Sequence, residues 1–474
     1  MPDNAVPTNI AELPAVVIGA GPVGLAAAAH LLERGLRPVI FEAGTGPGAA
    51  IRAWGHIRLF SPWRFNIDAA SRRLLEGTGW EEPRLTSLPY GTDLIERYIE
   101  PLAAVPAIRD ALHTSSRVIA VSRAGLDKAH SRHRDETPFL VRVLDASGTV
   151  ADHYARAVID ASGTWNQPNP LGAAGLPAPG EAEAIATGHI TEPLPDVTGC
   201  GRVRFAGKHI LVVGSGHSAA NTLLNLGQLA RNEPGTRISW AVRGADVTGL
   251  YGGGDLDGLP ARGQLGTRLR KLVEDGRIEL HTSFSITGFK TADTLAVFGL
   301  TPDGDVQLDV NLLIPATGFR PDLDMLRELR LELDPAVEAP RQLGPLIDPE
   351  FHSCGTVPPH GAKLLAHPDK DFYLTGMKSY GRAPTFLLAT GYEQVRSVAA
   401  AITGDREAAD KLQLELPETG VCSADLAGSC DAPAAVTTSD VEEAQEAACC
   451  AAPEPAFLGI PTGLAHGRSG LPAR

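Results

Sequence analysis

The sequence GAGPVG, residues 19–24, is the feature that most constrains the fold. It follows the apolar residues 15–18 and opens an Ala/Leu-rich stretch, 22–34, with Pro22 at its first position. Its G-x-G-x-x-G spacing is formed by Gly19, Gly21 and Gly24. In a strand–turn–helix unit, the first glycine permits a tight turn, the second leaves room for a pyrophosphate, and the third allows close helix packing. The pattern predicts a βαβ unit that binds a dinucleotide at the helix N-terminus.

An acidic residue stands where such a unit needs one. Residues 37–41 read as the second strand, and Glu42 ends it, at a distance from Gly24 that lets its carboxylate take the ribose hydroxyls of a dinucleotide. The alternative is a packing turn that happens to contain glycines, but that interpretation leaves Glu42 unexplained.

The same pattern returns later in the chain. The apolar residues 209–213 precede a second fingerprint, GSGHSA, and we expect a helix at 218–231 and a strand at 237–242. Its key positions are Gly214, Gly216 and Ala219, with alanine as an accepted variant at the third place. His217 and Ser218 lie at the helix start, where they either contact a pyrophosphate or cap the helix.

Arg243 follows the second strand of this later unit, where an acid would bind a ribose 2′-hydroxyl. A guanidinium there can pair with a 2′-phosphate, so the site favours NADPH over NADH. The alternative is an arginine that is simply solvated.

Three further strands end in small-residue turns: AVIDASG at Gly163, LLIPATG at Gly318 and FYLTG at Gly376. Such turns let backbone pass close to a ligand or to another segment.

These motifs together resemble the FAD- and NAD(P)-dependent pyridine-nucleotide oxidoreductases. The segments ASGTWNQPNP, 161–170, and FAGKHILVVGSGHSAAN, 205–221, are most similar to the flavin-containing monooxygenase branch. The resemblance implies FAD at the first fingerprint with Glu42, and NADPH at the second with Arg243. It also implies that Ala161, Gly163 and Gly318 line the crossing between two domains, and that the start of the last helix, near Thr385, faces the flavin.

The chain departs from that family in two places. The Phe-x-Gly-x-x-x-His signature before the second fingerprint is not present in clean form. The late glycine, Gly376, is usually followed by an acidic residue, but here Met377 and Lys378 follow it.

The expected fold class is α/β, with two Rossmann-like domains, the NADPH domain inserted in the FAD domain, and a flexible C-terminal tail. The predicted organisation is an FAD-binding first part at 1–170, a crossover at 171–205, an NADPH-binding domain at 206–325, an FAD-binding second part at 326–405 and a tail at 406–474.

The loop RLFSPWRFNID, 58–68, gathers aromatic and arginine side chains, and in the related family it flanks the flavin. Trp63 and Arg64 are the candidate residues for a flavin wall. The equally weighted alternative is an ordinary packed loop.

Composition limits the partners. The formal net charge is −14, which argues against nucleic acid or an anionic membrane as partner, and the first residues show no signal peptide. Few cysteines favour a cytoplasmic setting. We expect a small-molecule substrate, with oxygen as a co-substrate and a homodimer left open.

The cysteines indicate what the flavin can reduce. The chain has no C-x-x-C or C-x-x-x-x-C motif, so no redox disulfide is expected beside the flavin, and Cys200 is expected to be a small buried side chain. The tail holds the candidate ligands for a soft metal or metalloid: Cys422, Cys430, Cys449 and Cys450. The alternative is a disordered tail with incidental thiols.

The sequence therefore predicts an NADPH-dependent FAD oxidoreductase of the monooxygenase type. Two alternatives stay open: a metalloid- or thiol-directed flavin reductase that uses the tail cysteines, and a non-catalytic FAD/NADPH redox sensor. No residue is identified as a general acid or base.

Overall fold

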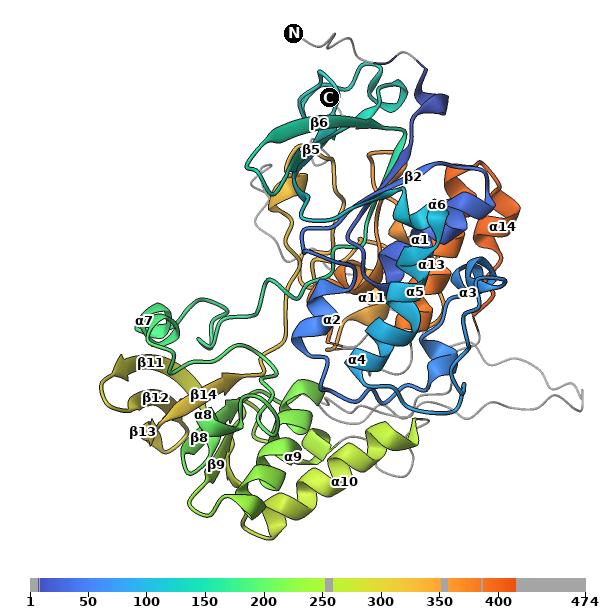
Figure 1. The fold of residues 1–474 in the computed structure, drawn as a ribbon. Coiled ribbons are helices and arrows are strands. Elements are labelled where there is room, and N and C mark those ends of the chain that lie inside the picture. The colour runs from blue at the N-terminus through green and yellow to red at the C-terminus, as the bar shows by residue number, and fades with distance from the viewer. Residues whose placement is uncertain (1–6, 8, 252–258, 351–356, 385–386, 415–474) are drawn as a thin grey trace, which may run out of the picture. The chain divides into compact units, whose positions relative to one another are not determined.

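The computed structural model describes residues 7, 9–251, 259–350, 357–384 and 387–414 (Figure 1). Its strands form two parallel sheets, and an antiparallel three-stranded sheet packs beside each of them. None of the helices in this part of the chain combines the length and the hydropathy that a membrane span requires.

The first parallel sheet has five strands, in the spatial order β15 (Phe372–Leu374), β7 (Ala157–Asp160), β1 (Ala15–Ile18), β2 (Pro38–Phe41) and β3 (Leu112–His113). Strand β1 lies in the centre, with Val17 opposite Ile40 of β2 and Ile159 of β7. The carboxyl ends of β1, β7 and β15 therefore meet at one edge of the sheet.

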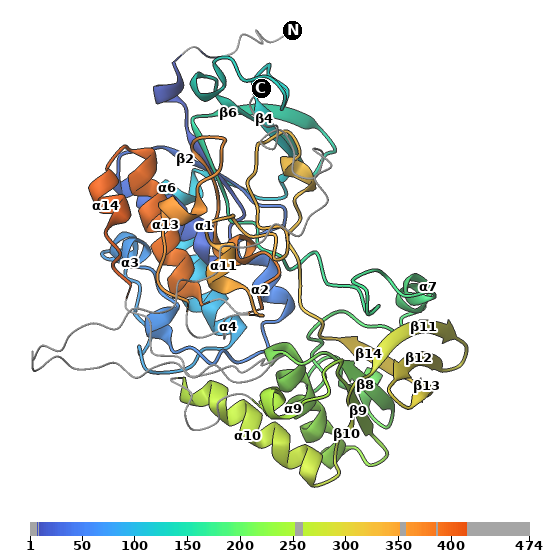
Figure 2. The same ribbon diagram turned by 180° about the vertical axis from the view of Figure 1, so that it is seen from behind.

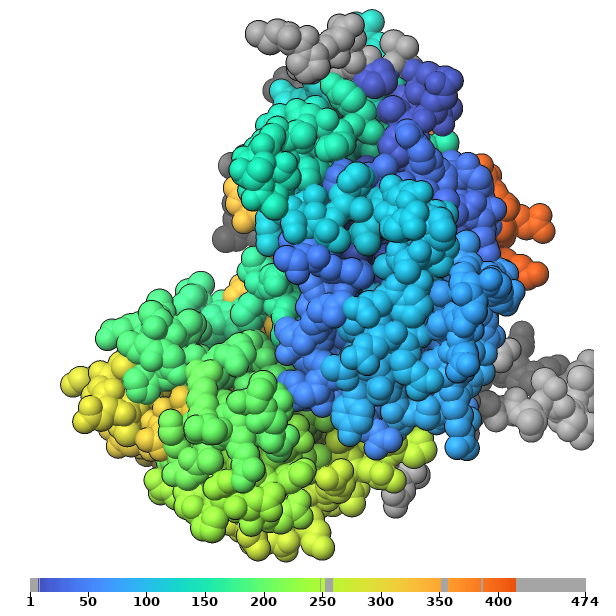
Figure 3. Space-filling model, viewed as in Figure 1, coloured from blue at the N-terminus to red at the C-terminus, as the bar shows by residue number. Residues whose placement is uncertain are grey.

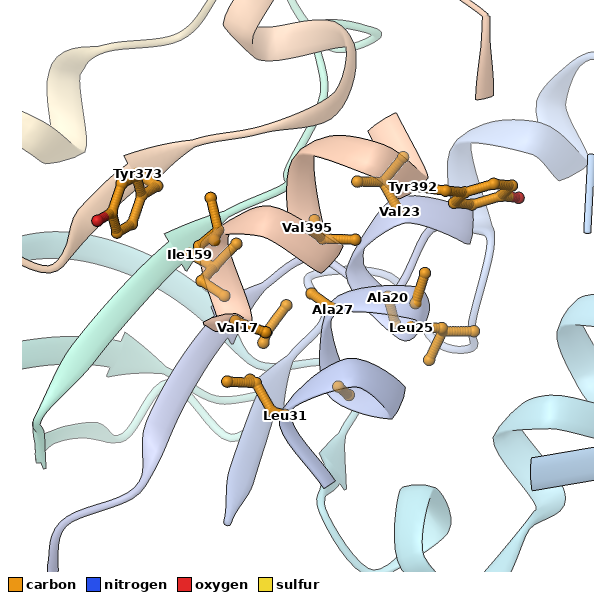
Figure 4. Packing of buried hydrophobic residues seen from close by; sticks show 14 of the residues in the cluster. Val17, Ala20, Val23, Leu25, Ala27, Leu31, Ile159, Tyr373, Tyr392 and Val395 are labelled. Atoms are coloured by element: carbon orange, nitrogen blue, oxygen red, sulfur yellow. The ribbon is translucent and has the colours of Figure 1, made fainter. Parts of the chain in front are cut away.

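Both faces of this sheet are buried, which explains why its strands are almost wholly apolar. On one face, Ala15 and Val17 pack with α1 (Pro22–Glu33) and α13 (Leu388–Ile402), two helices that contact each other. Figure 4 shows side chains from β1, β7, α1 and α13 in this core. On the other face, Val16 and Ile18 pack against the antiparallel sheet of β4 (Arg117–Arg123), β5 (Phe139–Leu144) and β6 (Val150–Ala155).

The second parallel sheet has the order β10 (Glu279–His281), β9 (Arg237–Ala241), β8 (His209–Val213) and β14 (Leu312–Pro315). One face packs against α9 (His217–Asn232) and α10 (Pro260–Glu274). The other packs against β11 (Ser285–Thr291), β12 (Leu295–Thr301) and β13 (Gly304–Val310). Figure 2 shows these elements from behind, grouped around β8 and β9.

The predicted fold class is confirmed. Strand β15 follows the complete second sheet in the chain, yet it pairs with β7 of the first, so the second sheet is inserted into the first. The two glycine fingerprints each join the first strand of such a sheet to its helix. Of the tail predicted at 406–474, residues 415–474 lie outside the described residues, whereas residues 406–410 form a short helix that packs on the last long helix, 388–402.

The crossover at 171–205 contributes buried residues to the core of the second sheet. Leu171, Ala184 and Ile190 are buried in the same core as Leu211 and Leu313 of the second sheet. Helix α7 (Glu181–Ala186) contacts β11 in this region. We call the five-stranded sheet with the elements that cover it the first lobe, and the four-stranded parallel sheet with its covering elements the second lobe. The crossover therefore packs as part of the second lobe, while the domain boundary at 206 stays a prediction.

Short helices complete the first lobe: α2 (Ala49–Ala53), α3 (Ala69–Leu75), α4 (Gly91–Leu94), α5 (Glu100–Ala104), α6 (Pro106–Arg109), α11 (Gly344–Ile347), α12 (Ala362–Leu365) and α14 (Arg406–Asp410). Another, α8 (Arg202–Phe205), ends the crossover. Figure 3 shows β4–β6 in blue-green and α2–α6 in blue at the surface of the face seen in Figure 1.

A buried cluster of charges ties β4 to the segment before β15. The Asp369 carboxylate accepts hydrogen bonds from Nε of Arg134 at 2.8 Å, from Nε of Arg123 at 3.3 Å and from the N–H of Arg330 at 2.6 Å. The side chains of Arg123, Arg134 and Asp369 are each at least 96% buried. Burial alone would raise the pKa of Asp369, but the hydrogen bonds and the arginine charges hold it below its ordinary value.

We predict that Asp369→Asn lowers the free energy of unfolding by about 3–5 kcal/mol, because it leaves two buried guanidinium groups without a carboxylate. The matched control is Asp152→Asn, which removes the exposed partner of Arg142 and should cost less than about 1 kcal/mol. Urea denaturation measures both.

The effect should depend on pH in one direction. A carboxyl with a lowered folded-state pKa stabilises the protein above its unfolded pKa, about 3.9, and loses that contribution as pH falls through the folded value. The gap between wild type and Asp369→Asn should therefore shrink below about pH 4. A gap that stays constant there, or equal costs for the two variants, would contradict the assignment.

Candidate functional site

The first glycine turn is tight and leaves open space at its second glycine. Gly19 has φ +96°, and a Cβ on Gly24 would lie 1.9 Å from the carbonyl oxygen of Gly19, so neither position accepts a side chain. A Cβ on Gly21 would meet no atom within 4 Å. In the described part of the chain, no side chain caps the amino end of α1, where Pro22 is the first helical residue. The turn thus has the shape and the free N–H groups that a phosphate needs.

Glu42 is fixed beside this turn. Its side chain is 91% buried, and its two carboxylate oxygens accept hydrogen bonds from the N–H of Ala20 at 2.7 Å and from the N–H of Gly44 at 2.6 Å. Each oxygen keeps a second lone pair for a hydroxyl donor. The open glycine turn and the oriented carboxylate fit the pyrophosphate and ribose of a bound dinucleotide.

Two other turns lie against the first. A Cβ on Gly19 would lie 2.9 Å from the carbonyl oxygen of Ala161 and 3.0 Å from Cα of Ser162. A Cβ on Gly376, which has φ +65°, would lie 3.4 Å from the Val23 side chain at the start of α1. The turns after β1, β7 and β15 therefore converge at one place, as expected where the carboxyl ends of parallel strands meet.

A polar network fixes the late glycine turn. The N–H of Gly376 donates to Oε1 of Gln394, a residue of α13, at 2.8 Å. The amide nitrogen of Gln394 contacts Oγ of Ser379 and Nε2 of His360, each at 2.8 Å. Burial lowers the pKa of His360, and its Nδ1 contacts the carbonyl oxygen of Pro358, an arrangement that fits a neutral ring.

The predicted helix start at Thr385 lies outside the described residues. Helix α13 begins at Leu388.

The second glycine turn repeats the geometry of the first. Gly214 has φ +129°, and a Cβ there would lie 2.1 Å from the carbonyl oxygen of Ala316. A Cβ on Gly216 would meet no atom within 4 Å. His217 and Ser218 are half-buried in the first turn of α9, and the His217 ring lies 5.1 Å from the Phe60 ring.

Arg243 follows β9 and is exposed. Its Nη1 donates to the carbonyl oxygen of Ala173 at 3.3 Å. Among the described residues, no carboxylate forms an ion pair with it. Its charge is thus available to an anionic ligand, such as a 2′-phosphate.

Two connections join the lobes, and they are hydrogen-bonded to each other. The N–H of Asn169 donates to the carbonyl oxygen of Gly318 at 2.9 Å, and Oγ1 of Thr317 donates to the carbonyl oxygen of Asn169 at 2.8 Å. The Trp165 and Phe319 rings lie 5.0 Å apart. Gly163 and Gly318 thus lie on neighbouring connections, and their role in lining a cofactor site stays a prediction.

The two residues proposed for a flavin wall have different surroundings. Trp63 is 1% exposed and belongs to the main core of the first lobe, with the Arg97 guanidinium 5.9 Å from its ring. Arg64 is exposed, with its guanidinium 4.9 Å from the Phe65 ring. The burial of Trp63 favours the packing interpretation for that residue, while the role of Arg64 stays a prediction.

The structure tests the expectation for Cys200 but not the expectation for the tail cysteines. Cys200 is exposed and free, so the expectation of a buried side chain is wrong for it, because Cys200 lies in a surface turn where its N–H donates to Asp196. Cys422, Cys430, Cys449 and Cys450 lie outside the described residues. Within the described ranges, no group of three or more His, Cys, Asp or Glu side chains has the arrangement of a metal site.

Sequence reasoning missed one part of this site. Asp160 ends β7, and its carboxylate pairs with Nζ of Lys378 at 2.7 Å, both side chains being fully buried. The available signals were an acid at the end of an apolar strand and a lysine within the apolar run FYLTGMKSY. Nothing in the sequence shows that these two residues meet.

Comparisons with known proteins agree with this architecture. A family model for pyridine nucleotide-disulphide oxidoreductases matches residues 13–338. No curated protein matches the sequence significantly.

Several solved structures share the fold. The bacillithiol disulfide reductase of Bacillus cereus has a TM-score of 0.61 at 17% identity and covers 83% of this chain and 99% of its own. The FAD-bound cadaverine monooxygenase of desferrioxamine biosynthesis from Erwinia amylovora has a TM-score of 0.59 at 14% identity, covering 86% and 98%. A flavin-containing monooxygenase from Stenotrophomonas maltophilia has a TM-score of 0.52 at 21% identity, covering 83% and 98%.

At these identities the structural likeness shows the fold alone. The family model spans more than half of the chain and includes both glycine turns. The chain belongs to the pyridine nucleotide-disulphide oxidoreductase family, and it is a flavin-dependent oxidoreductase by that membership.

Proposed function

We propose that this protein is an NADPH-dependent FAD oxidoreductase of the flavin-containing monooxygenase type. The observation that carries the proposal is the pair of open glycine turns at Gly21 and Gly216. Each turn lies at a helix start that no side chain caps among the described residues, and a charged residue, Glu42 or Arg243, follows the next strand. Two dinucleotide sites in one chain are what hydride transfer between a nicotinamide and a flavin requires.

The charged residues favour one assignment of the two sites. Glu42 offers carboxylate oxygens, which suit ribose hydroxyls and repel a 2′-phosphate, so FAD fits the first turn. Arg243 offers an exposed guanidinium, which suits the 2′-phosphate of NADPH at the second turn. When bound, NADPH supplies the hydride and FAD accepts it.

This chain's residues bind and orient both cofactors. The α1 and α9 N-termini hold the two pyrophosphates, Glu42 and Arg243 fix the two ribose ends, and the paired connections at Asn169 and Thr317 link the lobes.

The acceptor of the electrons is proposed to be oxygen or a small bound substrate. The sequence has no C-x-x-C or C-x-x-x-x-C motif, and among the described residues the single free cysteine, Cys200, is exposed in the crossover. A dithiol of the usual kind beside the flavin is therefore not part of the proposal.

A second candidate is a thiol- or metalloid-directed reductase that uses the tail cysteines. It is supported by the likeness to a bacillithiol disulfide reductase and by the vicinal pair Cys449 and Cys450. Under that alternative a soft metalloid binds the tail, because thiols prefer soft ions.

Rapid mixing separates the two candidates. Anaerobic NADPH should bleach the flavin absorbance in a single turnover. Admitting oxygen should then restore the spectrum of oxidised flavin. Hydrogen peroxide or an oxygenated product should accumulate in proportion to the NADPH consumed. If oxygen leaves the reduced flavin unchanged but a disulfide or mercuric ion reoxidises it, the reductase alternative is correct and the monooxygenase type is not.

Substitution of the two open glycines should separate the two cofactors. Gly21→Val should fold, because its Cβ meets no neighbour, but should lose FAD, because the side chain fills the space for the pyrophosphate. Gly216→Val should keep FAD and lose reduction by NADPH. Bound FAD after desalting and the thermal midpoint are the measurements. Full FAD content in Gly21→Val would mean that the first turn is not the FAD site.

Arg243 should set the choice between NADPH and NADH. Arg243→Ala removes a charge-assisted contact worth on the order of 1–3 kcal/mol, so the preference for NADPH should fall by roughly 5- to 150-fold. The control is Arg237→Ala, which removes an exposed arginine at the opposite end of β9. An unchanged preference in Arg243→Ala would rule out this residue as the discriminating group.

A further inference from the structure

The ion pair between Lys378 and Asp160 lies directly beneath the three converging turns. Asp160 is the last residue of β7, and Lys378 lies in the short helix of Gly376–Tyr380 that follows the adjacent strand β15. Nζ and Oδ2 are 2.7 Å apart, and both side chains are fully buried. The pair thus joins two strands at their carboxyl ends.

Asp160 connects to both turns that follow these strands. Its Oδ1 accepts hydrogen bonds from the N–H of Ser162 at 3.0 Å and from Oγ of Ser162 at 2.7 Å. Its backbone carbonyl accepts from the N–H of Thr375 at 2.9 Å. Nζ of Lys378 also donates to Oγ of Ser162 at 3.1 Å. A single buried carboxylate therefore fixes the turn at Ser162 and the turn at Gly376 relative to each other.

These two turns border the first glycine turn on both sides. Ser162 and Ala161 approach Gly19 so closely that a Cβ there would be at most 3.0 Å from them, and Gly376 abuts Val23. A displacement of either turn would therefore be transmitted to the backbone of residues 19–24.

Stability alone does not account for such a pair. Desolvation of two charges usually offsets their attraction, and a well-packed apolar pair of similar volume is often at least as stable. The better-supported use of a buried charged pair is to specify one arrangement among several. Here the arrangement specified is that of the three turns.

We infer that Lys378 is a positioning residue of the FAD site, which holds the turn at 161–163 and the turn at Gly376 in register through Asp160. The inference rests on the proposed assignment of FAD to the first glycine turn.

The test is a double-mutant cycle with two readouts, FAD affinity of the apoprotein and its urea midpoint. Lys378→Met and Asp160→Asn should each lower the midpoint and weaken FAD binding by about tenfold or more, the size of effect typical of residues that orient a ligand's direct contacts. The double variant has no unpaired buried charge and should recover most of the midpoint, but FAD should still bind weakly.

Arg134→Met is the matched control, because it removes a buried cation from the Asp369 cluster rather than from the three turns. It should lower the midpoint and leave the FAD dissociation constant of the folded protein unchanged. The inference is overturned if the double variant regains wild-type FAD affinity together with its midpoint, or if Lys378→Met binds FAD as wild type does. If the wild-type apoprotein itself binds no FAD, the proposed function fails and not merely this inference.

Discussion

The close contact between β1 and α1 is the constraint on which the rest of the structure depends. Only hydrogen fits at Gly24, because a Cβ there would lie 1.9 Å from the carbonyl oxygen of Gly19, so the helix starts directly after the strand end. Helix α13 packs on α1, and Ala161 and Gly376 lie close to the same turn. Space stays open at Gly21, where a Cβ would meet no atom within 4 Å.

The two lobes have glycine turns of the same backbone geometry, but the charged side chain near each turn is acidic in the first lobe and basic in the second. After the second strand of each unit stands one ionisable side chain: Glu42, held by two backbone N–H groups, and Arg243, exposed and without a carboxylate partner among the described residues. A fixed carboxylate and an exposed guanidinium favour different dinucleotides. In the proposed function, this difference is the reason for assigning FAD to the first glycine turn and NADPH to the second.

The parts that could be predicted from the sequence are those set by local spacing. Both glycine turns, Glu42 and the insertion of the second sheet follow from short patterns that each describe one strand–turn–helix unit. The parts that could not be predicted depend on contacts between distant residues. Asp160 and Lys378 are joined only because β7 and β15 are neighbours, and the crossover residue Leu171 is a core residue only because the second sheet leaves a face to be covered. The burial of Trp63 likewise depends on packing that an aromatic-rich loop does not reveal.

The proposed function requires that one chain holds two different dinucleotides at two separate turns. Equilibrium binding measures this most directly: FAD is quantified after extraction from the purified protein, and NADP⁺ is then titrated into the same sample by calorimetry. We expect one FAD and one NADP⁺ per chain, bound together, with NAD⁺ binding more weakly than NADP⁺. A single dinucleotide per chain, or displacement of FAD by NADP⁺, would contradict it.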